Sequence, residues 1–259
     1  MERPVIDAHI HLDHYEENEV EKIIQDLPVE SYPALIAVSY HLQSCKQNLA
    51  LAKRDPQVRP AFGFHPEQPL PATQELQALI QWMEEHVADM VAVGEIGLPY
   101  YTRKETPELK IEGYLELVEQ FLAFAKKWEK PVVLHAVYED ADLVCDLLEK
   151  HHIDNAHFHW FKGADATIER MRRQGYFISV TPDVVYEPEI QALVNKYPLE
   201  KMMVETDGPW PFEGPFKGKL THPRMIHESI KVIADIKNEE LEHVYQQLYQ
   251  NTIKFYRLV

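Results

Sequence analysis

The sequence predicts an α/β protein folded as a TIM-type (β/α)8 barrel, and three observations support this prediction. Eight short apolar runs rich in β-branched residues alternate with longer amphipathic segments along almost the whole chain. These runs are nearly continuously hydrophobic, as parallel strands covered on both sides are. Histidines or carboxylates stand at the ends of most runs, which is where a barrel places its chemistry. A doubly wound open sheet is the alternative, and the strand count favours the barrel.

Each expected element follows from its own pattern. Strands are short runs bounded by polar or turn-forming residues, and helices repeat apolar residues every three or four positions. The expected strands are Val5–His9, Ala34–Ser39, Val58–Phe64, Met90–Ile96, Val132–Ala136, Ala156–Trp160, Tyr176–Val180 and Met202–Thr206. The expected helices are Glu19–Leu27, Leu42–Lys53, Gln74–His86, Leu109–Trp128, Ala141–Lys150, Ala166–Arg173, Pro188–Lys196, Pro223–Asp235 and Glu239–Phe255. Together they predict a single barrel domain over residues 1–259.

Composition and charge limit the classes of partner. The chain has 26 basic and 42 acidic side chains and a net charge of −16. This charge argues against broad adhesion to nucleic acid or anionic lipid, although metal ions can still create a local site for an anionic substrate. No apolar run approaches the ~20 residues of a membrane-spanning helix, so no membrane association is expected. No protein partner can be inferred.

The cysteines indicate a reducing compartment. Cys45 and Cys145 lie far apart in helix-like segments, and neither belongs to a Cys-x-x-Cys pair. The first 20 residues carry charges and histidines where a signal peptide would be apolar. We therefore expect a cytoplasmic protein with free thiols.

The first strand ends in a pair of histidines. His9 and His11 stand two residues apart, so a regular strand directs both to the same face, with Asp7 one step deeper on that face. Two imidazoles that converge from one rigid strand make half of a transition-metal site. Two ordinary hydrogen-bonded histidines at a strand end are the alternative.

Other strand ends carry the same residue types. Glu95, His135, His159 and Asp207 each follow or close a later strand. Singly, each has a structural explanation. Glu95 could be a buried acid paired with a lysine, and His135 could be a core histidine. His157 could be the site residue in place of His159, and Asp207 could be a turn residue before Gly208. Jointly, they would be costly to bury without a counter-charge, and divalent cations would satisfy them as one cluster. The sequence therefore predicts one or two bound divalent metal ions.

The motifs at these ends resemble the TatD family of metal-dependent hydrolases. They are Asp7-x-His9-x-His11, Gly63-x-His65-Pro66, Gly94-Glu95-Ile96-Gly97-Leu98, Pro131-Val-Val-Leu-His135, His159-x-Phe161-x-Gly163, Glu205-Thr206-Asp207-x-Pro209 and Asn251-Thr252. The resemblance implies a barrel of the amidohydrolase-like superfamily, a one- or two-metal site and hydrolysis, with many members described as deoxyribonucleases acting on DNA ends. It places metal ligands at His9, His11, Glu95, His135, His159 and Asp207, with Glu95 bridging two metals.

The chain departs from the family at the rim of the site. Pro99 stands where the family usually has Asp, and Val137 stands where it usually has Arg. The segments His159 to Gly163 and Thr221 to Pro223 also differ. The missing arginine and the acidic charge favour the alternative function, an amidohydrolase-like enzyme that hydrolyses a small ester, lactone or amide. The family motifs favour the main prediction, a phosphodiesterase or deoxyribonuclease. A metal-stabilised scaffold without activity is disfavoured because every ligand position is present.

The expected roles follow from charge. Two divalent cations outweigh the two carboxylates, so the site attracts an anion and activates water. By the chain's resemblance to the superfamily, Asp207 is the candidate to take the proton from that water, and Glu95 is the shared ligand. Asp7 is expected to orient a histidine ligand through the other ring nitrogen. His65 and Lys162 are the candidate substrate-binding residues, although a solvated surface lysine is the simpler interpretation of Lys162.

Two further points concern the rim and the metal. Tyr100, Tyr101, Trp210 and Phe212 could stack on a nucleobase or line an apolar rim. A mixed set of histidines and carboxylates suits Zn, Ni, Co, Fe or Mn better than Mg, although family nucleases are commonly assayed with Mg.

Overall fold

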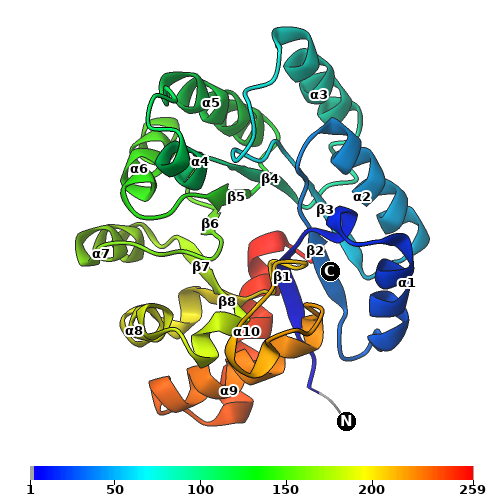
Figure 1. The fold of residues 1–259 in the computed structure, drawn as a ribbon, viewed down its shortest axis with the longest axis vertical. Coiled ribbons are helices and arrows are strands. Elements are labelled where there is room, and N and C mark those ends of the chain that lie inside the picture. Colours follow the sequence, from blue (N-terminus) through cyan, green and yellow to red (C-terminus); the bar gives the residue numbers. More distant parts are fainter. Residues whose placement is uncertain (1–2, 259) are drawn as a thin grey trace.

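The computed structural model describes residues 3–258, and its strands form a ring of eight in chain order. Figure 1 shows the helices surrounding this ring on the outside. The strands are β1 (Ile6–Ile10), β2 (Ala34–Ala37), β3 (Val58–Phe62), β4 (Ala92–Gly97), β5 (Val132–His135), β6 (Ala156–Phe158), β7 (Phe177–Val180) and β8 (Met202–Val204). All neighbouring pairs from β1 to β8 are parallel. Residues 1–2 and 259, the ends of the expected domain range, lie outside the described residues.

The ends of the ring meet through backbone hydrogen bonds. The N–H of Asp207, just after β8, donates to the carbonyl of His9 in β1 at 2.9 Å. The N–H of His11 donates to the carbonyl of Gly208 at 2.8 Å. These bonds bring the first and last strands together, as a barrel requires and an open sheet does not. The predicted barrel is therefore confirmed.

The helices occupy the predicted segments, with one addition. They are α1 (Glu17–Asp26), α2 (Leu42–Arg54), α3 (Thr73–Glu85), α4 (Tyr100–Glu105), α5 (Glu112–Lys127), α6 (Glu139–His151), α7 (Asp165–Gln174), α8 (Pro188–Lys196), α9 (Ile226–Lys237) and α10 (Leu241–Tyr256). The short α4 was not predicted, because six residues are too few for a helical repeat to be visible. Several strands are shorter than expected, since the chain leaves the sheet before the polar residues of the site. No helix within residues 3–258 has the length and apolar character to span a membrane.

Helix α5 illustrates how the outer layer forms. Tyr114, Leu117, Val118 and Phe121 recur every three or four residues and are buried against the barrel. Its first turn is acidic and its last turn is basic, which complements the helix dipole. Buried apolar residues also recur along the other long helices, and their packing against the strands holds the barrel in the shape on which the site depends.

The barrel interior is filled, and one end is closed by α10. A buried cluster joins residues of seven strands to Phe255 and Tyr256, near the C-terminal end of α10. The Tyr256 hydroxyl donates to the Ala8 carbonyl at 2.9 Å and lies 2.9 Å from Nδ1 of His157. Figure 1 shows α10, in red, lying across the ring of strands. The opposite end of the barrel carries the polar side chains.

Two strands are bulged where they carry ligand-type residues. Between Asp7 and Ile10, β1 advances three residues while β2 advances two. Between Val93 and Ile96, β4 advances three residues while β5 advances two. Each bulge inserts one extra residue and changes which side chains face the interior. His9 and His11 face the same site as expected, with Nε2 atoms 3.3 Å apart, but the expectation that Asp7 shares their face is wrong. Asp7 lies between Ile6 and Ala8, which both belong to the interior cluster.

Candidate metal centre

Three predicted ligands gather at one side of Glu95. His9 and His11 lie beside one of its carboxylate oxygens, and Asp207 lies beside both histidines. The Nε2 atoms of His9 and His11 lie 3.1 and 3.2 Å from Glu95 Oε2. They lie 3.2 and 3.5 Å from Asp207 Oδ1 and 3.3 Å from each other. We call His9, His11 and Asp207, facing Glu95 Oε2, the first ligand group. The β1 bulge and the backbone bonds between β1 and the end of β8 set its geometry.

The other oxygen of Glu95 faces a second set of histidines. Glu95 Oε1 lies 2.9 Å from His135 Nδ1 and 2.7 Å from His159 Nε2. His65 Nε2 is more distant, at 3.5 Å. We call His65, His135 and His159, facing Glu95 Oε1, the second ligand group. Glu95 thus directs one oxygen to each group, which is the arrangement that the predicted bridging role requires.

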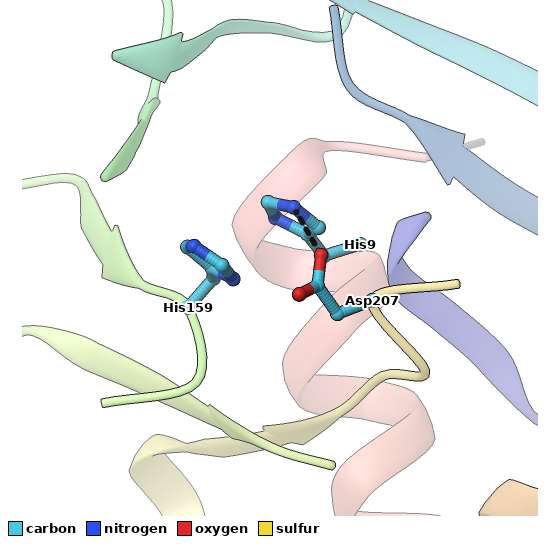
Figure 2. A group of neighbouring side chains, drawn as sticks. All are labelled: His9, His159 and Asp207. Carbon is cyan, nitrogen blue, oxygen red and sulfur yellow. Dashed lines mark ion pairs between the residues drawn. The ribbon is translucent and has the colours of Figure 1, made fainter. Parts of the chain in front are cut away.

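The two groups are close together. Figure 2 shows His9, His159 and Asp207 facing one another from three separate segments, with the His9–Asp207 ion pair dashed. The rings of His9 and His159 stack with centroids 3.9 Å apart. These three residues form one of the sets whose donor atoms lie within 4.8 Å of one another, as do His9, His11 and Glu95, and also His65, Glu95 and His135.

The spacing and chemistry of these atoms fit divalent cations. Ligands held about 2.1 Å from a tetrahedral or octahedral ion are about 3.0–3.4 Å apart. The separations within the first ligand group, 3.2, 3.3 and 3.5 Å, lie close to this range. Glu95 Oε2 and Asp207 Oδ1 are buried yet have no hydrogen-bond partner within residues 3–258. Unpartnered buried carboxylate oxygens are costly. Four imidazoles and two carboxylates suit Zn or a similar transition metal.

Without a metal, the carboxylates and imidazoles perturb one another. Burial disfavours a charged His11, but the Asp207 and Glu95 carboxylates, 3.5 and 3.2 Å from its Nε2, raise the pKa of His11 to about 10. Burial alone would raise the pKa of Asp207 and Glu95, yet the surrounding histidines hold the pKa of both well below the usual range. Burial lowers the pKa of His65 to about 3, so His65 is neutral. Cations can therefore replace protons as the positive charge beside both carboxylates.

Two carboxylates that were not predicted to contact the site stand behind the second ligand group. Glu67 Oε1 lies 3.1 Å from His135 Nε2. Burial would raise the pKa of Glu67, but the hydrogen bond from His135 and those from Thr102 lower it to about 2. Glu205 Oε1 lies 3.7 Å from His159 Nδ1 and accepts the Trp160 N–H at 2.8 Å.

Sequence reasoning missed Glu67 because the residue belongs to a loop after the third strand end. Glu205 was noted only as part of a motif. The available signal was that each stands two positions from a predicted site residue, since Glu67 follows His65 and Glu205 precedes Asp207 by two positions.

The expected role of Asp7 is wrong. Asp7 accepts the backbone N–H groups of His9 and Thr206 and the Thr206 hydroxyl, the last at 2.5 Å. Within residues 3–258 its carboxylate makes no hydrogen bond to a histidine ring, and it faces Thr206, just after β8. Burial raises the pKa of Asp7 to about 7. Asp7 therefore fixes the backbone that carries Asp207.

A cavity of about 710 Å³ opens over the two ligand groups. Its lining includes both candidate substrate-binding residues, three aromatic side chains and two rim acids: His65, Lys162, Tyr101, Trp160, Trp210, Glu67 and Glu105. Lys162 Nζ lies 4.7 Å from the centre of the Trp160 ring, and it is the one lysine or arginine in this lining. Trp210 and Tyr101 are 59% and 44% exposed, whereas Phe212 and Tyr100 are buried. Two of the four aromatic residues considered for stacking are thus available at the cavity.

The structure shows which of the two histidines of the sixth strand segment, His157 or His159, faces the site. His157 lies deeper than His159, with its Nε2 2.6 Å from Ser179 Oγ and its Nδ1 near Tyr256. Burial lowers the pKa of His157 well below the usual value. His157 therefore belongs to the packed interior, and His159 faces the cavity.

Comparison with known proteins identifies a family. Residues 6–257 match the family described as TatD related DNase. An uncharacterized metal-dependent hydrolase of Haemophilus influenzae is 38% identical over 255 residues, which cover 98% of this chain and 100% of that protein. The human deoxyribonuclease TATDN3 is 28% identical over 262 residues, which cover 97% of this chain and 94% of that protein.

A solved structure supports the same relationship. The crystal structure of YjjV, a TatD homologue from Escherichia coli, matches with a TM-score of 0.86 and 26% identity, covering 98% of each chain.

Proposed function

The chain belongs to the family of TatD-related DNases, and from this premise we propose that it hydrolyses phosphodiester bonds at DNA ends with one or two divalent metal ions. The proposal rests mainly on the position of Glu95 between the two ligand groups. Its two oxygens face two separate sets of histidines, as a ligand shared by two metals must. The family relationship favours this function over the alternative of a small ester, lactone or amide.

The proposed metal ligands are His9, His11, Glu95, His135, His159 and Asp207. Divalent cations bound there would supply Lewis acidity toward a phosphoryl oxygen and activate water at neutral pH. Glu95 is fully buried and holds its position between the groups. Asp207 lies at the cavity and takes the proton from the attacking water, then passes it to the leaving alkoxide oxygen. The surrounding histidines lower the pKa of Asp207, so the carboxylate is ionised.

Substrate binding is proposed for His65 and Lys162. Both line the cavity, and His65 is the member of the second ligand group farthest from Glu95. Lys162 is held over Trp160, where its ammonium group can meet a phosphate while the indole offers a flat face. The exposed Trp210 offers a second flat face for a nucleobase. One lysine beside two rim acids suits a short anionic end better than a long polyanion.

We also propose that the barrel is a single hydrolase domain over residues 1–259 and that the protein is cytoplasmic. The second proposal rests on the cysteines, since Cys45 and Cys145 are free, buried thiols. Burial raises the pKa of both to about 12, which keeps them as unreactive thiols.

A substrate panel tests the function. Each of Mg2+, Mn2+, Co2+, Ni2+ and Zn2+ is added to the metal-stripped chain with single-stranded DNA, a bis-phosphodiester dye, a phosphotriester or a lactone. We expect hydrolysis of the two phosphodiesters. Hydrolysis of the lactone alone would contradict the proposal.

A matched pair of lysine variants tests substrate binding. Lys162→Ala is expected to raise KM for the DNA substrate by about tenfold, the loss of one charged hydrogen bond. Lys110→Ala, at an exposed lysine outside the cavity lining, is the control and should leave KM unchanged. An equal KM in both variants would remove Lys162 from the binding site.

A further inference from the structure

Glu67 connects three parts of the molecule that are distant in sequence. It lies in the loop after β3, and 15% of its side chain is exposed. Its carboxylate accepts the backbone N–H groups of Tyr101 at 2.9 Å and Thr102 at 2.7 Å, and the Thr102 hydroxyl at 2.5 Å. Its Oε1 also lies 3.1 Å from Nε2 of His135, at the end of β5.

Through these contacts Glu67 accepts hydrogen bonds from free backbone N–H groups in the first turn of α4, those of Tyr101 and Thr102. The first N–H groups of a helix have no partner within the helix, and a side chain just before it normally accepts one of them. Here the residue before α4 is Pro99, which has no side-chain acceptor. Glu67 supplies the missing acceptor from another loop, and this anchors its carboxylate in one place.

The anchored carboxylate faces the outer nitrogen of His135. The inner nitrogen, Nδ1, lies 2.9 Å from Glu95 Oε1 and 3.1 Å from His159 Nε2. A neutral imidazole carries one proton, and a hydrogen bond on one nitrogen decides where that proton resides. With the proton on Nε2 and donated to Glu67, the lone pair of Nδ1 points toward Glu95.

We propose that Glu67 is a positioning residue that holds His135 in the orientation and tautomer required to bind a cation through Nδ1. The inference rests on the metal centre proposed above. A carboxylate behind a histidine ligand fixes the ring and makes it a stronger donor. The first ligand group lacks this support, since Nδ1 of His9 and of His11 has no hydrogen-bond partner in the described part of the chain.

The test is a Co2+ titration of the metal-stripped chain, followed by visible absorption and calorimetry. Glu67→Gln keeps the size of the side chain but removes its charge. We expect it to weaken one of two Co2+ equivalents by about 10- to 100-fold and to change the absorption of that equivalent only. Thr167→Val is the matched control. It removes a part-buried hydroxyl–carboxylate hydrogen bond, from Thr167 to Asp142 at 2.8 Å, and leaves Glu67 and the His135 contact intact, so it should lower the Tm of the metal-free chain and leave both affinities unchanged.

The outcomes separate this inference from the proposed function. Wild-type affinity for both equivalents in Glu67→Gln would overturn the positioning role while leaving the metal centre intact. Equal weakening of both equivalents together with a lower metal-free Tm would overturn it in favour of a structural role. A wild-type chain that binds no Co2+, Mn2+ or Zn2+ would overturn both the metal centre and this role.

Discussion

The two ligand groups share Glu95 but are built by different means. The first takes its histidines from a single bulged strand, and its third member follows β8. The second takes one histidine from the end of each of three strands, and one of these, His135, has the Glu67 carboxylate within hydrogen-bond distance behind it. Glu205 lies farther from His159 Nδ1, at 3.7 Å, and that nitrogen has no hydrogen-bond partner within the described residues. The backbone therefore positions the first group, whereas a side chain also helps to position the second. This difference predicts that substitutions behind the ligands disturb the second group more than the first.

The largest effect is expected where the groups meet. Glu95→Gln should remove the shared charge, so that neither cation is held tightly and hydrolysis falls by at least about 10³-fold, equivalent to about 4 kcal/mol of barrier. Metal content after dialysis and the rate on the bis-phosphodiester dye measure the two effects. A variant that keeps two tightly bound metals would show that Glu95 is no bridge.

Asp207→Asn tests the first group and the proton transfer together. We expect hydrolysis to fall by about 10²–10⁴-fold, because the amide cannot take a proton from water. Circular dichroism should show an intact fold, since Asn occupies the same volume. Persistent activity on every substrate would exclude Asp207 as the proton acceptor.

Two histidine substitutions, one in each ligand group, distinguish a metal ligand from a substrate-binding residue. We expect each to reduce hydrolysis less than the two substitutions above. His11 lies 3.2 Å from Glu95, and His65 lies 3.5 Å from it at the cavity. His11→Ala should lose one metal equivalent, whereas His65→Ala should keep both and raise KM. Metal analysis and steady-state kinetics distinguish the two variants, and loss of a metal in His65→Ala would make His65 a ligand.

The smallest effect is expected at the closed end of the barrel. Tyr256→Phe removes the hydroxyl that contacts the Ala8 carbonyl and His157, leaving two buried polar groups without that partner. The free energy of unfolding in urea should fall by about 1–3 kcal/mol while metal affinity stays unchanged. A loss of metal affinity instead would show that the barrel floor sets the positions of the ligands.

The architecture could be predicted because it depends on patterns that repeat. Buried parallel strands require continuous apolar runs, and covering helices require a repeat of three to four residues, so both are visible in the sequence. The convergence of Glu95, His135, His159 and Asp207 followed from the same logic, because the ends of barrel strands meet at one face.

The details of the site depend on features with no local pattern. A bulge adds one residue without changing composition, so the side to which Asp7 points was predicted wrongly. Glu67 reaches His135 across 68 positions, and such a contact exists only after the barrel closes. The short α4 is capped by this same residue, so its beginning had no signal of its own.

The closed end of the barrel determines how a substrate can reach the site and how a product can leave it. Among the described residues, α10 and the packed interior fill the barrel beyond the ligand groups, so the cavity opens on one side only. For the substrate proposed above, a strand terminus would enter and the cleaved piece would leave through the same opening.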